Sequence, residues 1–184
     1  MAKLIYMTFA SADGYVEDAS GSFDWAPSDE ELDLVNDLGR PVGTYLYGRR
    51  MYENMLFWET AHTLPDQPAF VLEFSKAWRA AEKIVFSTTL GSASSARTRI
   101  ERNFDPGLVR QLKSAAGPDM TVSGAGLAGQ AICAGLVDEL QLCLVPVLLG
   151  SGKKALPDAA RVDLKLVDTR RLASGTVYLR YRLS

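Results

Sequence analysis

The chain has 184 residues, a length that suits one domain with a substantial core, so residues 1–184 are expected to form a single domain. Hydrophobic residues make up 47% and charged residues 23% of the chain, which excludes disorder and fibrous repeats, and a formal net charge of -2 argues against nucleic acid as a partner. No apolar run approaches the ~20 residues that cross a bilayer, and the N-terminus lacks a signal-peptide pattern, so a cytoplasmic protein without a membrane partner is expected.

The N-terminal third predicts a buried strand, a long loop and a strand–helix pair. Residues 4–10 are continuously apolar, and 11–27 read as an irregular loop of the length that usually serves a site. A helix is expected from Ser28 to Gly39, with Ser28 as N-cap and Glu31 as its capping-box partner. Residues 42–47 then predict a strand that ends at Gly48, before a helix over 49–57.

The remaining two thirds continue to alternate between helices and strands. Expected helices cover 68–81, 106–115 and 127–135, and expected strands cover 83–86, 97–101 (an edge strand), 120–122, 136–147, 164–167 and 176–183. The last two strands are expected to be antiparallel. This order predicts a mostly parallel α/β sheet with an antiparallel C-terminal edge and helices on both faces.

The two cysteines and the single histidine give little sign of chemistry. Cys133 and Cys143 lie in apolar stretches without the spacing of a metal or redox motif, so buried reduced thiols are expected and no metal site is predicted. His62 stands in an expected loop with no acid–base partner nearby in the sequence, which favours a solvated side chain over a catalytic one.

Three expected turns directly follow strands, where an α/β sheet binds its ligands. Gly48 precedes Arg49 and Arg50, Ser87 and Thr88 follow the strand 83–86, and Gly124 and Gly126 bracket the start of a helix. Free N–H groups at a helix start and arginine guanidinium groups suit phosphate oxygens. Each glycine taken alone also fits a plain strand-to-helix turn.

Four sequence stretches, which follow one another along the chain, together resemble a known family and so help to interpret these turns. They are Ser11-Ala12-Asp13-Gly14-Tyr15-Val16, Leu46-Tyr47-Gly48-Arg49-Arg50-Met51-Tyr52, Lys83-Ile84-Val85-Phe86-Ser87-Thr88-Thr89-Leu90, and Gly135-Leu136-Val137-Asp138-Glu139-Leu140 continuing to Pro146-Val147-Leu148-Leu149-Gly150-Ser151-Gly152. Together they resemble the dihydrofolate reductase-like superfamily, in the branch of the C-terminal reductase domain of the bacterial riboflavin biosynthesis protein. The resemblance implies a three-layer dihydrofolate reductase-like fold.

The resemblance also implies hydride transfer from NADPH to a small heterocyclic or carbonyl substrate. Residues implied at the cofactor are Phe9, Ala10 and Val16 beside the nicotinamide, Gly48, Arg49, Arg50 and Met51 at the phosphates, Ser87 and Thr88 at the adenosine ribose phosphate, and Ser123, Gly124, Ala125, Gly126 and Leu127 at the pyrophosphate. The family usually carries two adjacent glycines in the last turn, and here Ala125 replaces the second.

The substrate side rests on fewer residues. In the resembled family a carboxylate near the first helix assists protonation, which makes Asp29 and Glu30 the catalytic candidates, although acidic residues there also favour the helix start itself. Trp25, Tyr52 and Trp58, with Phe57, could line an aromatic slot for a flat ring, or pack in the core. Asp13 is either a turn residue before Gly14 or a further candidate.

Several functions stay open at this point. The first is an NADPH-dependent reductase similar to 5-amino-6-(5-phosphoribosylamino)uracil reductase, although a partner deaminase domain is absent from the chain. Dihydrofolate reduction is an alternative enzyme activity, and a non-catalytic NADPH-binding protein is the alternative of another class. The apolar stretch Leu142-Cys143-Leu144-Val145 is compatible with a homodimer or with a buried strand.

Overall fold

The computed structural model describes residues 1–25, 29–115, 117–158 and 160–184. Its elements are β1 (Leu4–Ser11), β2 (Tyr15–Glu17), α1 (Asp29–Gly39), β3 (Val42–Gly48), α2 (Arg49–Met55), α3 (Phe57–Thr60), the 3-10 turn η1 (Ala61–Thr63), α4 (Ala69–Ala80), β4 (Glu82–Phe86), β5 (Thr98–Glu101), α5 (Pro106–Ser114), β6 (Asp119–Ser123), α6 (Ala125–Cys133), β7 (Glu139–Val145), β8 (Lys153–Lys154), β9 (Leu164–Arg171) and β10 (Val177–Leu183).

The centre of the fold is an eight-stranded sheet in the order β5-β4-β3-β6-β1-β7-β10-β9. The pairs from β5 to β7 are all parallel, and β10 pairs antiparallel with both β7 and β9. The predicted parallel sheet with an antiparallel C-terminal edge is therefore confirmed. The strand expected at one edge, β5, lies at that edge.

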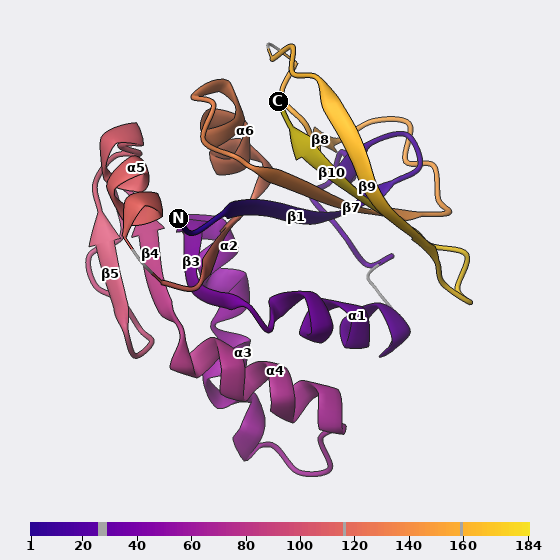
Figure 1. The fold of residues 1–184 in the computed structure, drawn as a ribbon. Coiled ribbons are helices and arrows are strands. Elements are labelled where there is room, and N and C mark those ends of the chain that lie inside the picture. The colour runs from indigo at the N-terminus through magenta and orange to yellow at the C-terminus, as the bar shows by residue number, and fades with distance from the viewer. Residues whose placement is uncertain (26–28, 116, 159) are drawn as a thin grey trace.

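Alternating side chains of the central strands divide the core between the two faces of the sheet. Leu4, Leu46 and Val122 point into a cluster with α5 and α6. Tyr45 and Tyr47 point to the other face and pack with α2 and α4. Figure 1 shows α5 and α6 on one side of the sheet and α1, α3 and α4 on the other, so helices cover both faces as predicted.

Helix boundaries follow local signals that the sequence carries. In α5 the side chain of Asp105 accepts a hydrogen bond from the Gly107 N–H at 2.8 Å, and Pro106 occupies the first turn. α1 ends at Gly39 as predicted. The predicted N-cap of α1, Ser28, lies outside the described residues.

Four sequence-based expectations were wrong in detail. The loop expected over 11–27 contains the short strand β2, which pairs with β8, and the helix expected over 49–57 divides into α2 and α3 at Leu56. The strand expected over 136–147 is confined to Glu139–Val145. Cys133 is exposed rather than buried because it ends α6 on the side away from the core, whereas Cys143 is buried as expected.

The apolar stretch 142–145 lies in β7, between β1 and β10. Leu142 and Cys143 are buried there, so pairing within the chain accounts for their apolar character. No helix in the described ranges combines the length and apolar character that a membrane span needs.

Candidate functional site

The three predicted turns lie side by side at the carboxyl edge of the parallel sheet. β3 runs between β4 and β6, with Gly48 paired to Phe86 on one side and Tyr47 paired to Ser123 on the other. The turns that begin at Gly48, Ser87 and Gly124 therefore leave the sheet from adjacent strands. Sequence alone put each turn after a strand, and the strand order brings the three together.

The turn at Gly124 requires a glycine. Its φ of +93° is a conformation that L side chains rarely adopt, and a Cβ at this position would lie 3.4 Å from the Met51 Cβ. α6 begins directly after it at Ala125, with no side chain capping the helix. The first N–H groups of a helix have no partner within it, so Ala125, Gly126 and Leu127 present donors at this edge.

Arg49 and Arg50 begin α2 and hold two different segments. Arg49 donates from Nε to Glu53 at 2.7 Å and from Nη1 to the Thr89 hydroxyl at 2.9 Å. Arg50 donates from Nη1 to Glu17 at 3.0 Å and from Nη2 to the Gly21 carbonyl at 3.2 Å. Both guanidinium groups are exposed, and they tie the turn after β4 and the loop after β2 to the start of α2.

The side chain of Ser87 shapes its own turn. Its hydroxyl oxygen accepts from the N–H groups of Thr89 and Leu90, at 3.3 and 3.0 Å, and its carbonyl accepts from Arg102. The hydroxyl proton is not used by these bonds and can be donated to an anion. The neighbouring Thr88 is exposed.

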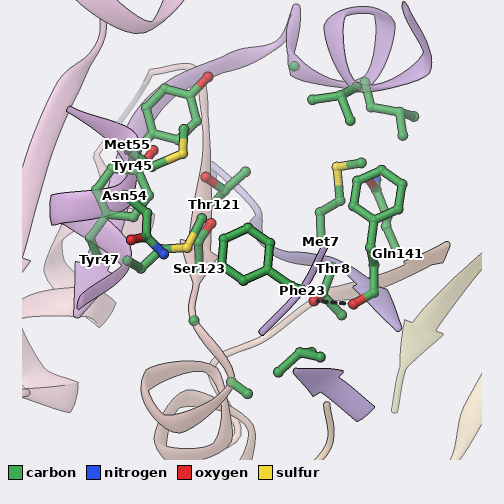
Figure 2. A pocket seen from close by; sticks show the side chains of 18 of the residues that line it. Met7, Thr8, Phe23, Tyr45, Tyr47, Asn54, Met55, Thr121, Ser123 and Gln141 are labelled. Atoms are coloured by element: carbon green, nitrogen blue, oxygen red, sulfur yellow. Dashed lines mark hydrogen bonds between the residues drawn. The ribbon is translucent and has the colours of Figure 1, made fainter. Parts of the chain in front are cut away.

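A cavity of about 470 Å³ opens between this edge and the helices of one face. Its floor is formed by β1, β3, β6 and β7, and its walls by α1, α2, α3 and α4, with the loop around Phe23 and Trp25 on a further side. Figure 2 shows Tyr45 and Tyr47 on one side, Thr121 and Ser123 in the middle, and Met7 and Gln141 on the other side. The cavity thus lies between the central strands and the helices that cover this face.

The cavity also has polar lining groups that no sequence motif indicated. Thr121 is 9% exposed, and its Oγ1 has no hydrogen-bond partner in the described part of the chain. The same holds for the buried Nε1 of Trp25. Gln141 and Asn54 add carboxamides to the lining. A buried polar atom without a partner is unusual in a folded protein and marks a place where a ligand can supply one.

Strand parity is the signal that could have found Thr121. Met120 and Val122 on either side of it are apolar and face α6, so Thr121 must face the opposite side of the sheet. A single polar residue among apolar ones in a central strand indicates a polar pocket on that face.

The structure brings together about half of the residues proposed from the sequence. The cavity is lined by Phe9, Val16, Arg50, Met51, Ser123, Gly124 and Ala125 from the cofactor set and by Trp25 and Trp58 from the substrate set. Ala10, Gly48, Arg49, Ser87, Thr88, Gly126 and Leu127 are not among the lining residues, although several belong to the three turns. Tyr52 is buried in the core instead, where its hydroxyl bonds Ser95 and the Ser94 N–H.

Asp29 and Glu30, the catalytic candidates, lie outside the cavity at the start of α1. The Glu30 carboxylate accepts from the N–H groups of Ala173 and Ser174, so it anchors α1 to the turn between β9 and β10. Asp13 accepts from the Ser11 hydroxyl and from the N–H groups of Gly150 and Leu149, and these bonds lower its pKa. His62 lies exposed in η1.

The titratable groups that line the cavity leave it close to neutral in its interior. Burial raises the pKa of Tyr45 to about 12, so this phenol stays protonated at neutral pH and can donate a hydrogen bond. Among the described lining residues the one carboxylate is Glu17, which is bound to Arg50. In the described ranges no cluster of His, Cys, Asp and Glu could hold a metal ion.

Comparisons with known proteins agree on one family. The RibD C-terminal domain family matches residues 2–178. An uncharacterized protein of Bacillus subtilis, YyaP, is 32% identical over 181 residues, which cover 97% of this chain and 94% of that one. These matches extend over almost the whole chain.

Solved structures agree in fold. A candidate riboflavin biosynthesis protein from Shewanella sp. PV-4 superposes with a TM-score of 0.75 at 18% identity, over 100% of this chain and 99% of that one. A diaminohydroxyphosphoribosylaminopyrimidine deaminase/5-amino-6-(5-phosphoribosylamino)uracil reductase from Thermotoga maritima superposes at 0.68 with 13% identity, over 100% of this chain but 57% of that one. At such identities the likeness concerns the fold alone.

Proposed function

The chain belongs to the RibD C-terminal domain family, and on that premise we propose that it is a reductase that uses NADPH to reduce a small heterocyclic or carbonyl compound. The Thermotoga maritima protein of the same fold combines a deaminase with a uracil reductase. This chain matches 57% of the length of that protein, and its own family is that of the RibD C-terminal domain, which favours the reductase activity over the deaminase activity.

The observation that carries the proposal is the meeting of three strand-end turns at the open edge of the cavity. Gly124 and the first N–H groups of α6 offer donors for a pyrophosphate, and a glycine at φ +93° keeps side-chain atoms away from that spot. Arg49 and Arg50 stand at the neighbouring turn with exposed guanidinium groups. The charge and shape of this edge therefore suit the phosphates of a dinucleotide.

The cavity floor suits a flat ring beside that edge. Phe9 and Val16 line the cavity near the ends of β1 and β2, and Trp25 and Trp58 add aromatic walls. When bound, NADPH supplies a hydride, which the carbon of the substrate C=O or C=N bond accepts while its oxygen or nitrogen takes up one proton. The residues of this chain orient the two reactants and exclude water.

Protonation does not require Asp29 or Glu30 in this proposal. Glu30 is bound to backbone N–H groups of the β9–β10 turn, and neither carboxylate lines the cavity. The neutral Tyr45 phenol and the Thr121 hydroxyl are among the lining groups that can hold or relay a proton. A dihydrofolate reductase would instead use a carboxylate inside the pocket, and the described carboxylate there, Glu17, is engaged with Arg50.

Cofactor binding is tested by the fluorescence of Trp25 and Trp58, which line the cavity, during titration with NADPH and NADH. Quenching that saturates with NADPH is expected. Arg49 donates to Thr89 in the turn proposed for the extra phosphate of NADPH. Arg49→Ala is therefore expected to weaken NADPH at least tenfold and NADH less, since one charge-assisted hydrogen bond contributes roughly 1.5–3 kcal/mol. The matched control is Arg99→Ala, a similarly exposed arginine of β5 that pairs with Glu101.

Three results would refute parts of this proposal. Absence of quenching at millimolar NADPH would show that NADPH is not the cofactor of this protein. Equal losses of affinity for NADPH and NADH in Arg49→Ala would show that Arg49 does not contact the phosphate that distinguishes NADPH from NADH. Saturable binding with no NADPH oxidation across a panel of pyrimidines, pterins and carbonyl compounds would leave a cofactor-binding protein without reductase activity.

A further inference from the structure

The inner half of the cavity has no charged side chain among its described lining residues. The cavity extends along the strands from Ile5, Val42 and Tyr45 to Phe9, Gly124 and Arg50 at the carboxyl edge. Next to the inner end, the walls come from α1, α3 and α4. The wall residues are Val35 and Leu38 of α1, Trp58 of α3, and Phe70 and Phe74 of α4.

The polar wall residue of α1, Asn36, already has a hydrogen-bond partner within the chain. Asn36 is 8% exposed and donates from Nδ2 to the Phe70 carbonyl at 3.0 Å, which joins α1 to α4. Charged residues at this junction point elsewhere: Arg40 pairs with Asp37 and Glu73 on the surface. The walls of the inner half are therefore apolar and aromatic.

Both cations that line the cavity stand in one cluster at the outer end. Arg50 binds Glu17, and Lys153 of β8 pairs across from Glu17 of β2. The same three residues, with the loop 18–21, also line a second, shallow hollow on the surface. This cluster adjoins the edge where the cofactor phosphates are proposed to bind, so a phosphate on the substrate would have to share these two cations with the cofactor.

The floor of the inner half offers hydrogen bonds instead of charge. Thr121 pairs with Ile5 on one side and with Tyr45 on the other, and Gln141 pairs with Met7. The Thr121 hydroxyl and the Gln141 carboxamide can each donate and accept, and Gln141 is only 4% exposed. A ring edge that carries both C=O and N–H matches such groups, whereas a phosphate dianion would lose its hydration without a counter-charge.

We propose that the substrate of this site is an uncharged, flat heterocycle with a lactam edge and without a phosphate group. The inference rests on the proposed reductase function and narrows it. It separates this chain from the uracil reductase named for the Thermotoga maritima protein, whose substrate carries a phosphoribosyl group.

The test compares two ligands that differ only in the phosphate: 5-amino-6-(5-phosphoribosylamino)uracil and its dephosphorylated form. Each is titrated into the whole protein saturated with NADP⁺, with calorimetry as the readout, so that the outer cluster is already occupied. The dephosphorylated ligand is expected to bind at least tenfold more tightly. Equal or tighter binding of the phosphorylated ligand, or no binding of either at millimolar concentration, would overturn the inference.

A pair of variants at one wall position adds a gain of function. Leu38→Arg places a cation in the inner half, beside Val42, and is expected to raise affinity for the phosphorylated ligand at least tenfold, whereas the matched Leu38→Gln is not. If Leu38→Arg melts too early to be measured, the wild-type comparison still decides. NADP⁺ binding is measured first, because it tests the proposed reductase function separately from the proposed substrate class. If NADP⁺ does not bind, the proposed function fails; if it binds, the ligand comparison tests the substrate class alone.

Discussion

Replacing Thr121 by Val is expected to make the free protein more stable and its ligand complex weaker. The Thr121 hydroxyl is buried and has no partner in the described part of the chain. A buried unpaired hydroxyl costs about 1–3 kcal/mol, and valine keeps the shape without the polar atom. The free energy of unfolding should rise by about 1 kcal/mol, which for a chain of this size raises Tm by about 2–4 °C.

Ligand binding should respond in the opposite direction. A lost hydrogen bond between Thr121 and the ligand weakens binding by about 0.5–1.5 kcal/mol, which is roughly a twofold to tenfold rise in Kd. Thermal melting of the free protein and calorimetry with NADP⁺ and the dephosphorylated uracil measure the two effects separately. Few other substitutions at a buried position are expected to raise the stability of the free protein and also weaken ligand binding.

Thr176→Val is the control for this substitution. Its hydroxyl is also buried, but it donates to Glu31 Oε1 at 2.6 Å. Loss of a hydrogen bond to a charged group should lower stability by roughly 1.5–3 kcal/mol. The reasoning about Thr121 is refuted if Thr121→Val lowers Tm as Thr176→Val does, or if it raises Tm and leaves every Kd unchanged.

Two further predictions concern the backbone of the site and its acid sensitivity. Gly124→Ala should lower the free energy of unfolding by about 1–3 kcal/mol, because alanine is strained at φ +93°. Gly126→Ala, in the open first turn of α6, should instead raise the free energy of unfolding by about 0.5–1 kcal/mol. Urea unfolding measures both variants, and equal effects would contradict the role of the positive φ. Asp13 has a folded-state pKa below its ordinary 3.8, so its carboxylate stabilises the fold above that value and the stabilisation is lost as pH falls through the folded pKa. The Tm difference between wild type and Asp13→Asn should therefore shrink between ~pH 6 and ~pH 3, and a constant difference would argue against the carboxylate.

The sheet and the three turns could be predicted from the sequence because they rest on local signals. Continuous apolar runs marked β1, β3 and β7, and Gly48 and Gly124 each stand directly between a strand and a helix. Pro106 likewise indicated the start of α5. These features depend on residues close together in the chain.

The cavity could not be predicted in the same way, because its parts meet only in three dimensions. Thr121 and Gln141 are 20 positions apart, on strands separated by β1, and neither belongs to a motif. Glu30 carried the signal of a catalytic acid, but its partners, Ala173 and Ser174, come from the far end of the chain. β2 is too short to be recognised without β8, which pairs with it.

The place of β1 in the sheet has a consequence for how the protein is made. Leu4 pairs with Met120 and Tyr6 with Leu140, so both neighbours of this first strand are translated long after it. Loop closure over such separations is slow, and both edges of β1 stay unpaired until β6 and β7 leave the ribosome. A nascent chain that stops before Glu139 therefore exposes an apolar strand edge, which can pair with other chains until synthesis is complete.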